Sequence, residues 1–155
     1  ARLFYTQGDY GLFQCARNCS GETYDNERQV REMVGSQKDQ RVPSELVPRC
    51  PRCGAPLVPN LRVDGSFCED RGWHEAASRY RAFCETHSSD RVLYFELGVG
   101  NSTPVIIKYP FWNAVGRNGN ATYACVNIGG ACAPAAIAGR SILVDGDIDE
   151  FLQTF

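Results

Sequence analysis

Near-continuous apolar runs in the second half of the chain predict the strands of a parallel sheet. The clearest run covers residues 92–97, and two others follow at 122–128 and 141–144. Strands that are buried on both faces form such runs, whereas half-buried strands alternate apolar and polar side chains. Glycine-rich turns and helical patterns separate the runs, so the sequence predicts an open parallel α/β sheet.

The first half of the chain has a weaker and more broken pattern. Residues 2–6 alternate slightly and predict a short strand, while residues 7–11 predict a turn because they include two glycines. Asp25 is expected to cap a helix that ends at Gly35. Residues 56–63 contain two prolines and are expected to be extended and irregular.

Two more helices are predicted by apolar positions at helical spacing. The first runs from about residue 70 to residue 87, and its stripe is more typical of a core-facing side than of a cofactor site. The stripe consists of Trp73, Ala76, Ala77, Tyr80, Phe83 and Cys84. The second helix ends the chain, with one face formed by Ile148, Phe151, Leu152 and Phe155.

Four cysteines in two close pairs give the strongest chemical signal. Cys15 and Cys19 form the first pair, and Cys50 and Cys53 form the second in the sequence Cys-Pro-Arg-Cys-Gly. Two such pairs separated by a loop can place four thiolates at the corners of a tetrahedron, as a closed structural Zn²⁺ site requires. Gly54 lets the backbone bend toward the sulfur atoms. Two disulfides or four unrelated core thiols are the alternatives.

Composition excludes several classes of partner. The 155 residues carry a net charge of −2, so no basic surface for nucleic acid is expected. No apolar run approaches the ~18 residues of a membrane span. The remaining cysteines lie singly and are expected to be buried thiols, which together with a zinc site indicates the reducing cytoplasm. They are Cys68, Cys84, Cys125 and Cys132.

Two predicted strands end in glycine and asparagine, at residues 98–103 and 127–130. Ligands of open parallel sheets bind beyond the carboxyl ends of the strands. Glycines there let the backbone approach a phosphate, and Asn127 can hydrogen-bond a ribose hydroxyl. Glycine after a strand is also ordinary turn chemistry, and neither G-x-G-x-x-G nor G-x-x-x-x-G-K-[ST] is present. A nucleotide site and a plain turn therefore both remain possible from these residues alone.

Long segments of the chain resemble the sirtuin superfamily, and most closely its macrodomain-linked, class M members from microbes. The likeness covers nearly the whole chain and rests on residues 5–11 (Tyr-Thr-Gln-Gly-Asp-Tyr-Gly), residues 95–104 (Phe-Glu-Leu-Gly-Val-Gly-Asn-Ser-Thr-Pro) and residues 106–112 (Ile-Ile-Lys-Tyr-Pro-Phe-Trp). The cysteine module, Val126-Asn127 and Gly146-Asp147 fit the same family. The resemblance implies a partial Rossmann-like NAD-binding part over residues 1–14 and 88–155. A zinc-binding module with a helical insertion would occupy residues 15–87.

The resemblance also implies roles for particular residues. Gln7 stands where most sirtuins have the catalytic histidine. Its amide does not titrate, so it can orient a group but cannot act as a general base. Zn²⁺ would be held by the four paired cysteines. NAD would lie over the strand ends, on Gly98, Gly100, Asn101, Thr103, Asn127 and Asp147.

The implied function is NAD-dependent protein ADP-ribosyl transfer. The acceptor would be a lipoylated carrier related to the glycine cleavage H protein, and a macrodomain protein is a further expected partner. NAD-dependent deacylation, or binding without catalysis by a zinc-stabilised module, are the alternatives. The family's glycine-rich NAD loop would precede Ala1. We therefore expect this chain to be the C-terminal portion of such an enzyme, inactive and self-associating when alone.

Overall fold

The computed structural model describes residues 2–154 and divides the chain into two compact units. The division falls between Arg81 and Ala82, inside a helix. Phe155, which was expected on the apolar face of the last helix, lies outside the described residues. Each unit is described by itself below.

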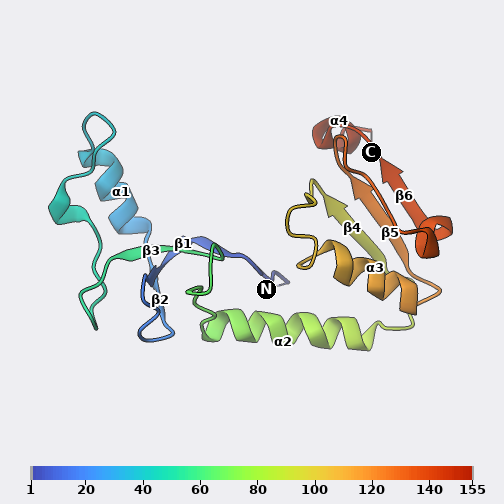
Figure 1. Cartoon of the computed structure of the whole chain (residues 1–155), viewed down its shortest axis with the longest axis horizontal. Helices are drawn as coiled ribbons and strands as arrows, with labels where there is room; N and C mark the ends of the chain where they lie inside the picture. The colour runs from blue at the N-terminus through green and yellow to red at the C-terminus, as the bar shows by residue number, and fades with distance from the viewer. Residues whose placement is uncertain (1, 155) are drawn as a thin grey trace. The chain divides into compact units, whose positions relative to one another are not determined.

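The first unit is built on a small antiparallel sheet. Its strands lie in the order β2-β1-β3, with β1 paired to both neighbours (Figure 1). Most of a long helix, α2, belongs to the same unit. Its elements are β1 (Gly8–Cys15), β2 (Thr23–Asp25), α1 (Glu27–Ser36), the 3₁₀ helix η1 (Ser44–Leu46), β3 (Leu57–Leu61) and α2 (Arg71–Thr86).

The start of β1 corrects two predictions. Residues 2–5 belong to neither helix nor strand, and the strand begins inside the predicted turn, at Gly8. The turn lies earlier, where the Gly8 N–H donates to the Tyr5 carbonyl at 3.1 Å. Gly8 has a φ of +102°, which side chains rarely permit, so the chain can turn sharply there before it pairs with β3.

Residues 57–61, expected to be irregular, form the strand β3. Within the described residues β3 pairs with β1 alone, so it is an edge strand. Edge strands tolerate proline because the missing N–H can face away from the ladder. Pro59 lies opposite Phe13 in this register. The proline therefore indicated an edge strand rather than the absence of a strand.

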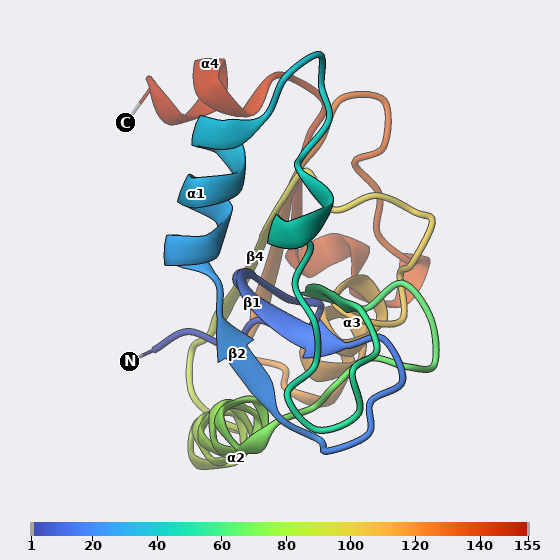
Figure 2. The same ribbon diagram turned by 90° about the vertical axis from the view of Figure 1, so that its left-hand side faces the viewer.

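The first helix begins and ends one residue later than predicted. Asn26, not Asp25, is the N-cap residue, and its side chain donates to the Tyr10 carbonyl at 2.7 Å. Asp25 ends β2, although one of its carboxylate oxygens still accepts from the Glu27 N–H at 3.2 Å. The helix runs through Gly35 to Ser36 and contacts η1 (Figure 2).

The helix α2 is present as predicted, but its apolar stripe is less buried than expected. Ala76 is the buried member of the stripe, whereas Phe83 is 54 % exposed. Within the first unit, the Phe4 ring covers part of the stripe, 5.2 Å from the ring of Trp73 and 5.8 Å from that of Tyr80. Phe83 lies beyond the division, at the start of the second unit, where its ring lies 4.6 Å from that of His87.

The second unit contains the predicted parallel sheet. Its strands lie in the order β4-β5-β6, and both pairings are parallel, which confirms the predicted fold class (Figure 1). The connections are those expected of such a sheet, with a helix or 3₁₀ turn between successive strands. The elements are β4 (Leu93–Leu97), α3 (Lys108–Arg117), β5 (Thr122–Val126), the 3₁₀ helix η2 (Ala135–Arg140), β6 (Ser141–Val144) and α4 (Ile148–Leu152).

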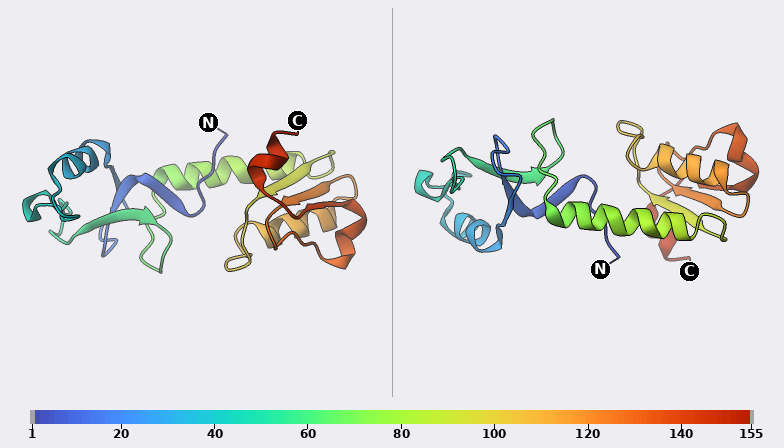
Figure 3. Two further views of the ribbon diagram at one scale, coloured as in Figure 1. Left: turned by 90° about the horizontal axis from the view of Figure 1, so that it is seen from above. Right: turned by 90° about the horizontal axis from the view of Figure 1, so that it is seen from below.

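The core of the second unit lies on one face of this sheet, under α3 and η2 (Figure 3). Its buried members are Val115, Ala121, Tyr123, Cys125 and Ile137. The prediction that residues 92–97 are buried on both faces is wrong for β4. Its side chains alternate instead, and Leu93 is 58 % exposed on the face that α3 does not cover. Among residues 2–154, no helix is both long and apolar enough to cross a membrane.

Candidate metal centre and cofactor site

The four paired cysteines meet in one cluster of the first unit. The Sγ atoms of Cys15, Cys19, Cys50 and Cys53 all lie within 4.8 Å of one another. Two of the separations, Cys15 to Cys53 and Cys19 to Cys50, are 3.6 Å. A Zn²⁺ ion bound at about 2.3 Å by four sulfurs requires them about 3.8 Å apart. All four are free thiols, so the geometry fits a metal and does not fit two disulfides.

Tight turns bring each pair of thiols to the cluster. After Cys15 the Asn18 N–H donates back to the Cys15 carbonyl at 2.8 Å, with Asn18 at a φ of 44°. After Cys50 the Gly54 N–H donates to the Cys50 carbonyl at 2.9 Å, and Gly54 has a φ of 70°. The second turn has the glycine that the sequence predicted. The first uses asparagine, which tolerates this conformation better than most residues.

Backbone N–H groups favour the thiolate form at two of these sulfurs. The N–H groups of Cys19 and then Arg17 lower the pKa of the Cys15 thiol to about 6. The N–H of Cys53 is the main cause that lowers the pKa of Cys50. Side-chain hydrogen bonds, first with Cys53 and then with Cys50, raise the pKa of Cys19 to about 12. A metal ion would displace the proton that Cys19 retains in this network, since only thiolates bind zinc.

In the second unit, several predicted NAD residues gather beyond the carboxyl ends of β4 and β5. The Gly98 N–H donates to the Val126 carbonyl at 2.9 Å, and the Asn127 side-chain amide donates to the Val99 carbonyl at 3.0 Å. A Cβ on Gly130 would lie 3.0 Å from the Asn127 amide nitrogen and 3.9 Å from that of Asn101. Both amides therefore lie close to the position that a side chain would occupy at Gly130.

Other predicted NAD residues have different surroundings. One carboxylate oxygen of Asp147 accepts from the N–H groups of Asp149 and Glu150 at 2.8 and 3.1 Å, so Asp147 is the N-cap of α4. Gly100 and Thr103 lie in the exposed loop between β4 and α3. Their assignment to NAD stays a prediction that rests on the resemblance.

Gln7 lies at an exposed turn of the first unit, directly before β1. Its carbonyl accepts from the Arg62 N–H at 2.9 Å. Residues 8–15 pair with β2 and β3, which flank the cysteine cluster, so by its contacts this segment belongs with residues 15–81. The catalytic role of Gln7 and the assignment of residues 1–14 to the NAD-binding part stay predictions.

A buried ion pair in the second unit was missed. The side chains of Glu96 in β4 and Lys108 in α3 form a salt bridge and are both fully buried. The second carboxylate oxygen of Glu96 and the Tyr123 hydroxyl are also buried, and burial, followed by the Glu96 side chain, raises the pKa of Tyr123. A lone glutamate inside an apolar run was the available signal, because a buried charge requires a partner.

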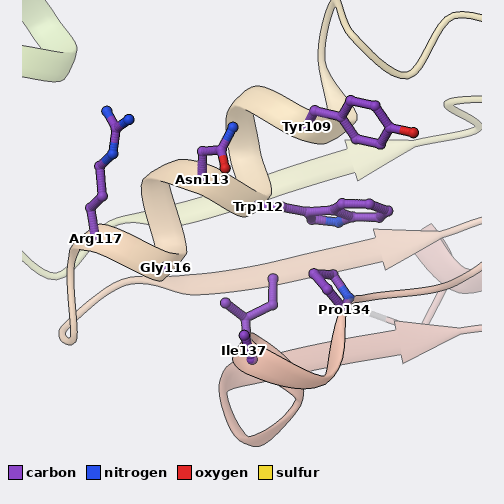
Figure 4. A pocket seen from close by; sticks show the side chains of 8 residues that line it. Tyr109, Trp112, Asn113, Gly116, Arg117, Pro134 and Ile137 are labelled. Carbon is purple, nitrogen blue, oxygen red and sulfur yellow. The ribbon is translucent and has the colours of Figure 1, made fainter.

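A hollow of about 450 Å³ lies between α3 and η2 (Figure 4). Trp112, Pro134 and Ile137 line its inner part, and Arg117 lies at one end. None of the predicted site residues lines this hollow.

Comparison with known proteins gives one clear relation and no match to a family model. The chain is 39 % identical over 153 residues to a protein of Staphylococcus aureus (strain Mu50 / ATCC 700699) named "Protein ADP-ribosyltransferase". The alignment includes 98 % of this chain and 49 % of that relative. The chain thus spans about half the length of the curated relative it matches.

Proposed function

We propose that this chain is part of an NAD-dependent protein ADP-ribosyltransferase of the sirtuin superfamily, acting on a lipoylated carrier protein. The observation that carries the proposal is the 39 % identity over 153 residues to a protein named as an ADP-ribosyltransferase. The four-cysteine cluster and the parallel sheet agree with the zinc module and the Rossmann-like part that the resemblance implies.

The proposed NAD site uses the strand ends of the second unit. Backbone groups near Gly98 would approach the phosphates, and the Asn127 amide would bind a ribose hydroxyl. The proposal is supported by the glycines at both positions, Gly98 and Gly130, since a residue without a side chain lets its backbone come close to a ligand, and Gly98 has a positive φ of 64°. Bound NAD would supply an ADP-ribosyl group when its bond to nicotinamide breaks.

Residue 7 distinguishes transfer from deacylation in this proposal. Deacylation by sirtuins uses a base to activate a ribose hydroxyl, and a glutamine amide cannot take up that proton near neutral pH. Gln7 can still hydrogen-bond and orient either the ribose or the acceptor. ADP-ribosyl transfer is therefore the reaction that the residue permits.

The test uses the full-length protein that contains this chain, because its relative is twice as long. The protein is incubated with labelled NAD and, in parallel, with a lipoylated H-like carrier, the same carrier without lipoate, and an acyl-lysine peptide. We expect label on the lipoylated carrier and none on the unlipoylated one. Efficient deacylation of the peptide, or no consumption of NAD with any acceptor, would contradict the proposal.

A further inference from the structure

Arg62 contacts two successive carbonyl groups of the segment that carries Gln7. It directly follows β3, and its backbone N–H donates to the Gln7 carbonyl at 2.9 Å. Its side-chain Nε donates to the Thr6 carbonyl at 3.2 Å. One residue thus holds the peptide groups on both sides of the Gln7 Cα.

The guanidinium group of Arg62 is itself fixed by three neighbours. Its terminal nitrogen lies 2.6 Å from a carboxylate oxygen of Glu69. Its central carbon lies 4.2 Å from the centre of the Phe67 ring and 5.6 Å from the centre of the Trp73 ring. Stacking on aromatic faces and a fixed fork of N–H donors are properties of arginine that lysine lacks.

The other side of the same turn has little freedom. The Gly8 N–H donates to the Tyr5 carbonyl, and a Cβ on Gly8 would lie 1.9 Å from the Asn60 carbonyl oxygen. The main chain at Gly8 is therefore pressed directly against β3. Together, Gly8 and Arg62 fix both ends of the short segment from Thr6 to Gly8, while the side chain of Gln7 remains exposed.

We propose that Arg62 is a positioning residue, which holds the Gln7 backbone so that the Gln7 amide is presented at one fixed place. The inference rests on the proposed function, in which Gln7 orients the ribose or the acceptor. Small misplacements of an orienting group reduce turnover more than binding. Arg62 is thus expected to affect the rate of ADP-ribosyl transfer through Gln7, and not through NAD affinity.

The alternative is that Arg62 makes an ordinary surface ion pair. Its side chain is 34 % exposed and that of Glu69 is 36 % exposed, and such pairs contribute little to stability. The chain offers a matched control of that kind. Arg31 lies 2.8 Å from Glu27 on α1 in the same unit, with side chains 76 % and 69 % exposed.

The test is a double-mutant cycle in the full-length protein, with Arg62→Lys, Gln7→Ala and the two combined, beside Arg31→Lys. We expect Arg62→Lys to lower kcat for ADP-ribosyl transfer about 10-fold with an unchanged KM for NAD. In the Gln7→Ala background the same change should alter kcat less than about 2-fold, because the group it positions is already gone. Arg31→Lys should leave kcat unchanged.

Hydrogen exchange of the Gly8 amide gives a second readout that needs no catalysis. It should become faster in Arg62→Lys, by about 10-fold, and not in Arg31→Lys. If transfer occurs but the effect of Arg62→Lys persists undiminished without Gln7, the positioning role is wrong while the proposed function stands. If no ADP-ribose is transferred at all, the proposed function fails. Unchanged exchange of the Gly8 amide in Arg62→Lys would show separately that Arg62 does not hold the backbone of Gln7.

Discussion

The two units are held together by different means. The first buries small or sulfur-containing side chains around its cysteine cluster, such as Cys15, Cys50 and Ala55, with Leu57 packed against them. The second buries a larger apolar cluster around Tyr123 and Val115. Small domains with little apolar core commonly depend on metals or cross-links for stability. We therefore expect metal dependence in the first unit and packing dependence in the second.

Their buried polar groups differ in the same way. In the first unit, neutral amides satisfy one another: Asn60 donates to the Gln14 side chain at 2.8 Å and to the Cys68 carbonyl at 3.0 Å. In the second unit the buried polar pair is charged, Glu96 with Lys108. An amide network that loses one member can be repaired by water, whereas an ion pair that loses one member leaves a buried charge.

The largest expected effect comes from breaking the cluster with Cys50→Ser. Structural zinc contributes about 10–16 kcal/mol of folding free energy in small zinc modules. We expect loss of bound zinc and loss of amide protection in β1 and β3, while β5 stays protected. Metal analysis and hydrogen exchange measure both. Cys132→Ser, at a half-buried cysteine outside the cluster, should keep its zinc. Retention of full protection in the first unit without metal would refute the contrast between the units.

The second prediction concerns the charged pair. Lys108→Met leaves Glu96 buried without its partner and should lower the free energy of unfolding of the second unit by about 3–5 kcal/mol. Chemical denaturation followed through the aromatic signals of Trp112 and Tyr123 measures this change. Zinc content should not change.

A double variant sharpens the interpretation of that result. Replacing both partners, with Glu96→Leu and Lys108→Met, removes the unpaired charge and should recover a large part of the lost stability. If the double variant is as unstable as the single one, side-chain packing rather than charge explains the loss.

The third prediction concerns Gln7, which is expected to affect the rate of transfer, whereas the strand ends are expected to affect NAD affinity. Gln7→Ala should reduce ADP-ribosyl transfer about 10- to 100-fold, equivalent to ~1.4–2.7 kcal/mol, with little change in NAD affinity. In the wild type this residue should leave the rate flat between about pH 6 and 8. Gln7→His should introduce a limb near the reference histidine pKa of ~6.5. Rates measured across this pH range check the flat profile of the wild type and the limb in Gln7→His. Undiminished transfer in Gln7→Ala would show that Gln7 only occupies a turn and has no part in the reaction.

The smallest expected effect separates the two roles considered for Asp147. As an N-cap, it should contribute about 1 kcal/mol, which Asp147→Ala removes and Asp147→Asn largely keeps. As an NAD ligand, it should affect NAD affinity in both variants. Thermal unfolding and NAD titration on the same two proteins distinguish these cases. Unchanged NAD affinity in both would limit Asp147 to capping α4.

Local patterns predicted the features that depend on neighbouring residues. The cysteine spacing predicted the cluster because each pair closes its own turn, at Asn18 and at Gly54. The apolar runs predicted where the parallel strands lie, although only the β5 run is largely buried, while Leu93 in β4 and Ile142 in β6 are more than half exposed. Both signals are contained within a few consecutive residues.

Features that join distant segments were not predictable in this way. The hydrogen bonds from Arg62 to the Thr6 and Gln7 carbonyl groups join residues more than fifty positions apart, and no local pattern predicts them. The beginning of β1 depends on how closely Gly8 can approach Asn60 in β3. Exposure of Leu93 depends on which face α3 covers. Each is a property of tertiary arrangement rather than of propensity.

The contact at Gly8 also has an evolutionary consequence. Any nucleotide change that replaces a glycine adds at least a Cβ, and at this position that atom would overlap the Asn60 carbonyl oxygen. Gly21 and Gly54 also have positive φ, but a Cβ on either would meet open space, so asparagine or aspartate is tolerable there. Among natural variants, we therefore expect no amino-acid substitution at Gly8, whereas asparagine or aspartate should occur at Gly21 and Gly54.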